Sequence, residues 1–152
     1  MSELISTQEL VVSFLDLRGF AKKICPKLDD KQIFRFLSRY YLIVERNLKG
    51  SGGQVIKYIG DGILMVFPSS EVGNAVDTLR KTKRKVDGWL LKRRLDATLS
   101  VRAHVGRVAV GHIGSTRNLD VVGTEVNKTA RLPCADGIVL SEELKRRIKT
   151  VM

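Results

Sequence analysis

The stretch from Val55 to Phe67, VIKYIGDGILMVF, constrains the fold of this chain more than any other. Its two apolar runs flank Gly60-Asp61-Gly62, which predicts two antiparallel strands joined by a tight glycine turn. Asp61 then lies at the tip of the turn, where the neighbouring glycines leave its carboxylate uncrowded. This position suits a metal ligand, but Asp-Gly is also a common hairpin turn for conformational reasons alone. These residues by themselves leave both interpretations open.

The rest of the chain predicts further strands and helices on both sides of this hairpin. We expect strands over Leu10–Leu17, over Leu99–Val110 with a bulge or bend at Gly106, and over 119–122 and 138–140. We expect helices over Asp29–Leu48 and over Glu71–Leu95, the second with a possible interruption at Gly88. Two further helices are expected, one from a Thr124 cap to Leu132 and one after a Ser141 cap. The order βα, ββ, αβ predicts an α+β sandwich of ferredoxin-like character. Its sheet is mainly antiparallel, with helices packed on it.

Length and composition are those of one globular domain spanning residues 1–152, without internal repeats or linkers. No apolar run approaches the ~20 residues that a membrane span requires. The N-terminal sequence lacks the basic and apolar regions of a secretory signal. Cys25 and Cys134 form no CxxC pair, as expected in a reducing compartment. We therefore expect a cytoplasmic protein.

The net charge of +11 is the unusual bulk property. Much of this charge lies between Arg80 and Arg94, where Asp87 is the only acidic residue. The stripe could meet nucleic acid, anionic lipid or a nucleotide phosphate, or it could be the solvated face of a helix whose apolar residues are buried. We favour the solvated face and do not expect a nucleic-acid partner.

Two separated acids are the first candidate site. Asp16 ends the first predicted strand, in FLDLRGF, and Asp61 lies at the hairpin turn. In this topology the two strands are neighbours, so both carboxylates can reach one edge of the sheet. An oxygen-only site with few protein ligands suits Mg²⁺ or Mn²⁺, which retain waters and take further ligands from phosphates.

A second candidate group follows. Asn127 and Arg131 are four residues apart on a predicted helix and therefore share one face. The planar guanidinium of Arg131 suits charge that builds on a phosphate, although the pair also suits an ordinary polar helix face. Lys57 and Asp120 are a cation and an acid in or beside strands, where simple solvent exposure is the alternative explanation.

Four segments, FLDLRGF, IKYIGDGILMVFP, VRAHVGRVAVGHIGS and LDVVGTEVNKTARL, resemble in their order and separation the catalytic domain of class III nucleotidyl (adenylate/guanylate) cyclases. The resemblance covers nearly the whole chain. It implies that Asp16 and Asp61 bind two Mg²⁺ or Mn²⁺ ions, and that the turn formed by Leu17, Arg18, Gly19 and Phe20 holds a triphosphate.

The same resemblance implies roles for the second group. Lys57 and Asp120 match the pair that reads the purine edge, and they are similar to the pair that selects adenine. Asn127 matches the residue that orients the ribose, and Arg131 the one that stabilises the transition state. Arg107 matches a position that is basic in some members, where it would contact phosphate.

The activity implied is adenylate cyclase: ATP is converted to 3′,5′-cyclic AMP and pyrophosphate. In this family the metal aspartates and the remaining residues come from different subunits, so a homodimer is implied.

The family usually continues into a further hairpin with a phosphate-binding lysine. Compared with the family, we expect a domain that is short at its C-terminus. The alternatives are a cyclase that uses GTP or a pyrimidine triphosphate, and a weakly active homologue that binds nucleotide or nucleic acid. The hairpin sequence IGDGI does not match the GGDEF motif of diguanylate cyclases.

Overall fold

A computed structural model describes residues 4–115 and 117–151 of this chain. The strands are β1 (Ser6–Arg18), β2 (Gln54–Ile59), β3 (Gly62–Pro68), β4 (Thr98–His112), β5 (Leu119–Val122) and β6 (Ile138–Leu140). The α-helices are α1 (Asp30–Leu48), α2 (Val72–Lys92), α3 (Thr124–Ala130) and α4 (Glu142–Val151). No helix in the described part of the chain is both long and apolar enough to cross a membrane.

All described strands belong to one sheet with the order β2-β3-β1-β4-β5, and β6 pairs with β4. Only the β4–β6 pairing is parallel. The long antiparallel ladder between β1 and β4 runs from Ser6 opposite Val110 to Arg18 opposite Thr98. The predicted α+β, ferredoxin-like sandwich with a central hairpin is confirmed.

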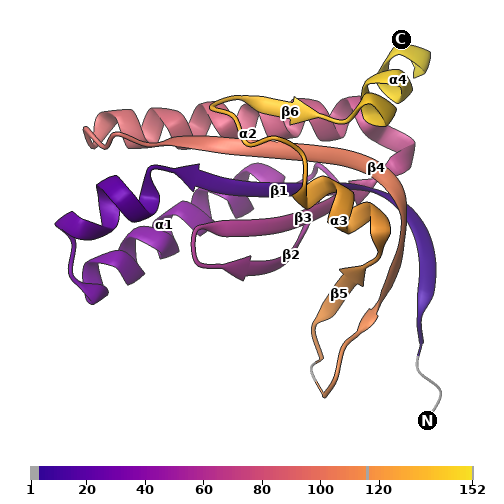
Figure 1. Ribbon diagram of the computed structural model, residues 1–152, viewed down its shortest axis with the longest axis horizontal. Coiled ribbons are helices and arrows are strands. Elements are labelled where there is room, and N and C mark those ends of the chain that lie inside the picture. Colours follow the sequence, from indigo (N-terminus) through magenta and orange to yellow (C-terminus); the bar gives the residue numbers. More distant parts are fainter. Residues whose placement is uncertain (1–3, 116, 152) are drawn as a thin grey trace.

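The two faces of the sheet, whose layers Figure 1 shows, bury two separate apolar clusters of side chains. Helices α1 and α2 cover one face, and the first cluster there contains the fully buried Tyr40. The second cluster lies on the opposite face and includes Val12, Leu64 and Val121, with Val126 from α3 packed on it. Alternation along β1 therefore sends odd-numbered residues such as Leu15 to the first cluster and even-numbered ones such as Val12 to the second.

Several predicted details differ from the structure. Helix α2 runs through Gly88 without interruption, because its buried face continues to Leu90 and outweighs the weak helix propensity of one glycine. Gly123, not Thr124, occupies the N-cap of α3. Of the bulge or bend predicted at Gly106, the bulge is absent, since β4 pairs regularly with β1 on both sides of this glycine. A Cβ at Gly106 would lie 2.6 Å from Cγ of Glu125, so this glycine gives α3 room to approach the sheet.

Two helix starts agree with the sequence. Asp29 and Gln32 form a capping box at the start of α1. The hydroxyl of Ser141 accepts a hydrogen bond from the N–H of Leu144 (3.1 Å), as expected for the cap of α4.

Candidate active site

The two predicted metal ligands lie together at one end of the sheet. One carboxylate oxygen of Asp61 accepts a hydrogen bond from the N–H of Leu17, the residue after Asp16, at 2.9 Å. The β2–β3 turn that carries Asp61 contains only two residues between the paired Ile59 and Gly62. Gly60 takes the positive φ of 59° that such a turn requires at its first central position.

Two tyrosines of α1 hold this turn in place. The hydroxyl of the buried Tyr40 donates to the carbonyl oxygen of Asp61 at 3.0 Å, and Tyr41 donates to the carbonyl oxygen of Gly60. Neither role is visible in the sequence, because periodicity shows Tyr40 only as part of an apolar helix face. The metal-ligand candidate is therefore fixed by the helical layer and not by the turn alone.

Charge at this end of the sheet is concentrated around Asp16. Burial raises the pKa of the Asp16 carboxyl, and the nearby Asp61 raises it further, while Arg102 and Arg18 oppose the rise. Arg102 lies on β4 with its Nη2 atom 3.4 Å from Oδ2 of Asp16. Arg102 is not among the site residues predicted from the sequence, although a cation in the apolar stretch LSVRAHV is a visible signal.

The donor set fits a divalent cation of the magnesium type. The described residues contain no group of three or more His, Cys, Asp or Glu side chains that could hold a metal. Asp16 and Asp61 alone would leave most coordination positions to water and phosphate oxygens, as Mg²⁺ prefers.

The chain after Asp16 turns sharply. Gly19 adopts a φ of 97°, and its carbonyl oxygen accepts hydrogen bonds from the N–H groups of Lys23 (2.8 Å) and Ile24 (3.3 Å). Phe20 begins a short π-helix, Phe20–Ile24. A hollow of about 580 Å³ beside this turn is lined by Arg18, Gly19, Lys22, Lys23, Asp96, Ala97, Thr98 and Asp136. The predicted triphosphate turn thus borders an open space of mixed charge, in which Arg18 pairs with Asp136 and Lys23 with Asp96.

Lys57 and Asp120, the predicted base-reading pair, meet within this single chain. The Nζ atom of Lys57 lies 3.0 Å from Oδ2 of Asp120. A bulge makes this possible: Val55 pairs with Met65 but Lys57 pairs with Leu64, so Ile56 is an extra residue in β2. Because the bulge shifts the alternation by one residue, Lys57 lies opposite Leu64 of the second cluster and faces β5.

Asn127 and Arg131 lie one helical turn apart and are both exposed. The N–H of Arg131 donates to the carbonyl oxygen of Asn127 at 3.1 Å. No hydrogen bond or ion pair between described residues joins Asp16 or Asp61 to this pair or to Lys57 and Asp120. The predicted site residues form two groups in one chain: Asp16 with Asp61, and a set on β2, β5 and α3, where β5 packs against both β2 and α3.

Arg107 belongs to neither group. It is exposed on β4, pairs with Glu9 in the ladder, and donates to the carbonyl oxygen of Thr7 at 3.4 Å. Ser100, the partner of Asp16, is seven residues away along β4, roughly 23 Å at the usual rise of a strand. Arg107 is therefore too far along β4 to contact a phosphate beside Asp16 of its own chain.

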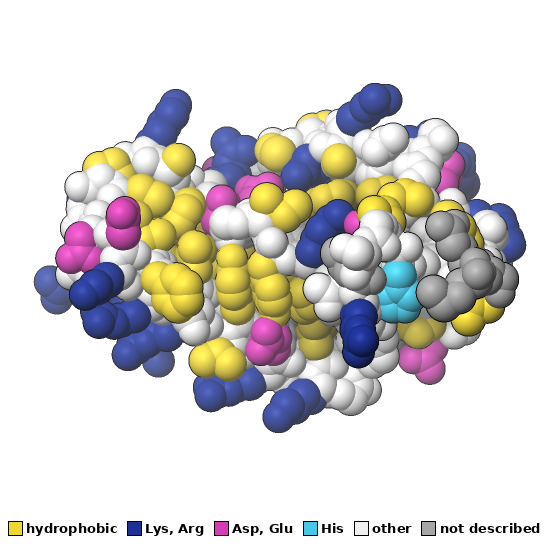
Figure 2. All heavy atoms as spheres, turned by 90° about the horizontal axis from the view of Figure 1, so that it is seen from below, with side chains coloured by type: hydrophobic (Ala, Val, Ile, Leu, Met, Phe, Trp, Pro, Cys, Tyr) yellow, Lys and Arg dark blue, Asp and Glu magenta, His cyan; other side chains and the backbone are white. Residues whose placement is uncertain are grey.

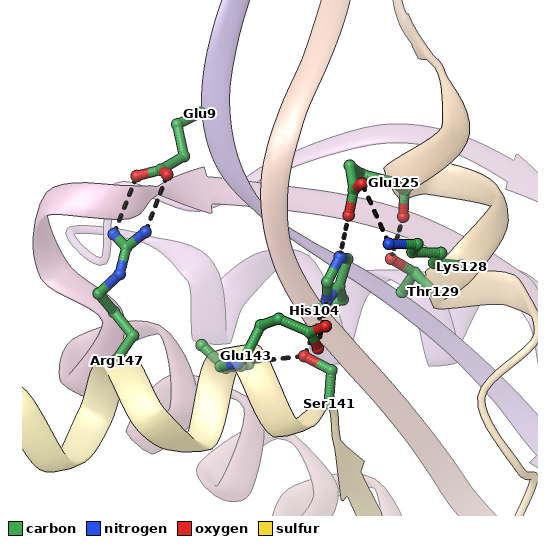
Figure 3. A network of polar contacts seen from close by, with 9 residues as sticks. Glu9, His104, Glu125, Lys128, Thr129, Ser141, Glu143 and Arg147 are labelled. Atoms are coloured by element: carbon green, nitrogen blue, oxygen red, sulfur yellow. Dashed lines mark hydrogen bonds and ion pairs between the residues drawn. The ribbon is translucent and has the colours of Figure 1, made fainter.

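A buried histidine fastens α3 to the sheet and to α4 (Figure 3). Nε2 of His104 contacts the carboxylate of Glu125 on α3, and Nδ1 lies 2.8 Å from Oγ of Ser141. The hydrogen bond from His104 lowers the pKa of Glu125, with a further contribution from Lys128. These contacts fix the helix that carries Asn127.

Residues 3–149 match the family described as the adenylate and guanylate cyclase catalytic domain. The chain belongs to this family, the class III nucleotidyl cyclases.

Curated relatives include adenylate cyclases. The adenylate cyclase of Anabaena cylindrica is 26% identical over 137 residues, which cover 84% of this chain and 27% of that protein. The terminal-differentiation specific adenylate cyclase of Dictyostelium discoideum is 26% identical over 132 residues, covering 82% of this chain and 6% of that protein. The chain thus spans about a quarter or less of the length of these relatives.

Solved structures share the fold. The adenylyl cyclase CyaB from P. aeruginosa has a TM-score of 0.88 and 23% identity, covering 97% of this chain and 84% of that one. The guanylyl cyclase Cya2 has a TM-score of 0.82 and 24% identity, covering 97% and 80%.

Proposed function

We propose that this chain is an adenylate cyclase that converts ATP to 3′,5′-cyclic AMP and pyrophosphate. The observation that carries the proposal is the convergence of Asp16 and Asp61 at one sheet end, together with the ready-formed Lys57–Asp120 pair. A lysine donates and a carboxylate accepts hydrogen bonds, which matches the ring-nitrogen acceptor and amino donor of adenine. The relatives named adenylate cyclase support the same substrate.

The chain's own residues would supply binding and charge. Asp16 and Asp61 would hold two Mg²⁺ or Mn²⁺ ions, which when bound supply charge neutralisation for the attacking and leaving oxygens. Lys57 and Asp120 would orient the adenine, and Asn127 the ribose. The 3′-oxygen then forms a bond to the α-phosphorus as the bond to pyrophosphate breaks, and its proton passes to water. Arg131 would donate to the charge that builds on the α-phosphate.

Two groups in one chain support a twofold homodimer. In such a dimer the carboxylates of one subunit meet the α3 group of the other, and symmetry makes two complete sites. Large apolar side chains remain exposed at the ends of the strands that carry the base-reading pair: Ile59 is 65% exposed and Val122 is 46% exposed. Hydrophobic side chains form a band across the side of the molecule seen from below in Figure 1 (Figure 2). We assign this side of the molecule to the contact with the second copy.

We further propose that the enzyme is cytoplasmic, where ATP is available.

GTP is the second candidate substrate, because the guanylyl cyclase Cya2 shares the fold closely. The test is to incubate the purified chain with each of ATP, GTP, CTP and UTP, with Mn²⁺ or Mg²⁺, and to resolve the products by chromatography. We expect cyclic AMP and pyrophosphate from ATP. Cyclic GMP as the main product would favour the second candidate, and release of pyrophosphate without any cyclic product would refute both.

A further inference from the structure

Arg102 lies between Asp16 and the end of α3 within one chain. Its side chain is only 14% exposed, and it lies on the same face of the sheet as Asp16. Nη2 is 3.4 Å from the Asp16 carboxylate, Nη1 donates to the carbonyl oxygen of Ala130 at the end of α3, and the guanidinium lies 5.8 Å from the Phe14 ring centroid. The positive charge therefore lies beside the carboxylate that would bind a metal.

The hydrogen-bonding capacity of this guanidinium is not fully used. An arginine carries five N–H donors. Among the described residues, Nε of Arg102 is buried and has no hydrogen-bond partner. Its contact with Asp16 is a single one at 3.4 Å, longer than a well-formed charge-assisted hydrogen bond. A buried donor without a partner is costly, so we expect Nε of Arg102 to gain a further acceptor when substrate is bound.

A divalent cation and Arg102 would neutralise the same carboxylate. A cation held by Asp16 would cancel most of the charge that attracts the guanidinium, so the 3.4 Å contact would weaken and Arg102 would be available to another acceptor. Phosphate oxygens are strong acceptors for an arginine fork.

We propose that Arg102 is an exchangeable counter-ion. Without bound metal, Arg102 neutralises the Asp16 carboxylate; when Asp16 binds a metal ion, Arg102 donates hydrogen bonds to the polyphosphate of the substrate. This inference rests on the proposed function for the identity of the substrate. It adds a phosphate-binding residue that the sequence analysis did not predict, in a chain where no lysine was matched to that role.

The first experiment measures binding of Mn²⁺ alone by calorimetry. Arg102→Ala removes the competing cation, so its affinity for Mn²⁺ should rise roughly threefold to fivefold, as expected for a partly exposed ion pair. Arg102→Lys keeps the charge and should bind Mn²⁺ like the wild type. Arg84→Ala removes an equal charge from the exposed surface of α2 and should change nothing. Unchanged or weaker Mn²⁺ binding by Arg102→Ala with an unaltered melting temperature would overturn the proposal.

The second experiment needs no metal and remains informative where Arg102→Ala alone folds poorly. Tripolyphosphate is titrated in the presence of a chelator. Asp16→Asn frees Arg102 and should bind tripolyphosphate roughly tenfold more tightly than the wild type. Asp61→Asn removes the same charge nearby without freeing Arg102, so its gain should be clearly smaller. Equal gains in the two variants would refute the transfer of Arg102 to phosphate.

A double variant completes the second experiment. Asp16→Asn combined with Arg102→Gln should lose the gain in affinity for tripolyphosphate. A gain that persists without Arg102 would also contradict the proposal. Neither experiment depends on turnover, so a chain that binds as expected but forms no cyclic nucleotide would refute the proposed function and leave the role of Arg102 supported.

Discussion

Mixing two inactive variants tests whether each active centre is shared between copies. Asp16→Ala removes a metal ligand, and Asn127→Ala removes the ribose contact; no hydrogen bond or ion pair between described residues joins these two side chains within one chain. With equal amounts and random exchange, about half of the dimers contain one chain of each kind. In these dimers one site carries both substitutions and the other carries none. The mixture should therefore recover about a quarter of the wild-type activity.

The assay is cyclic nucleotide formation after the two variants are mixed, with exchange verified by native mass spectrometry. The matched control mixes Asp16→Ala with Asp61→Ala. Both substitutions affect the same group, so every site in the mixed dimers lacks one carboxylate and no activity should return. Recovery in the control, or no recovery in the first mixture despite proven exchange, would show that the two groups do not combine across subunits.

Three further predictions concern single positions. Tyr40→Phe removes the hydrogen bond to the carbonyl oxygen of Asp61, so thermal unfolding should show a loss of about 1–2 kcal/mol and Mn²⁺ should bind more weakly; wild-type Mn²⁺ affinity would contradict the positioning role. Gly106→Ala forces a methyl group against α3, at a cost of about 1–3 kcal/mol, and should reduce turnover while Mn²⁺ binding persists; unchanged stability would refute the close approach. The Arg147 guanidinium lowers the pKa of Glu9 from 4.5 to about 2, so this contact stabilises the fold above pH 4.5 and the stabilisation is lost as the pH falls towards 2. Glu9→Gln should lower the free energy of unfolding in denaturant by about 1 kcal/mol at neutral pH, and this difference from the wild type should vanish as the pH approaches 2. A difference that stays constant with pH would contradict an ionic contribution of Glu9.

The architecture followed from local patterns in the sequence. The hairpin around Asp61, the periodicity of α1 and the alternation of β4 are each visible within a short window, and together they define the order of elements. The placement of Asp16 beside Asp61 followed from that topology, because strands β1 and β3 are neighbours.

Contacts between distant segments were beyond the reach of the sequence. The bulge at Ile56 depends on how β2 fits its partner strand, and it alone decides which face Lys57 occupies. Tyr40 and Arg102 were missed for a related reason. A buried tyrosine and a cation in a strand acquire their roles from partners 21 and 86 residues away, and no periodic pattern encodes those partners.

The extra residue in β2 also matters for how the protein behaves at high concentration. β2 is the terminal strand of the sheet, and such strands are templates on which another copy can add its own backbone. The bulge at Ile56 interrupts the row of backbone donors and acceptors that an incoming strand would pair with, and the charged Lys57 follows directly after it. The bulge and the lysine therefore oppose the addition of another strand to β2, and this edge of the sheet stays available for contacts made by side chains.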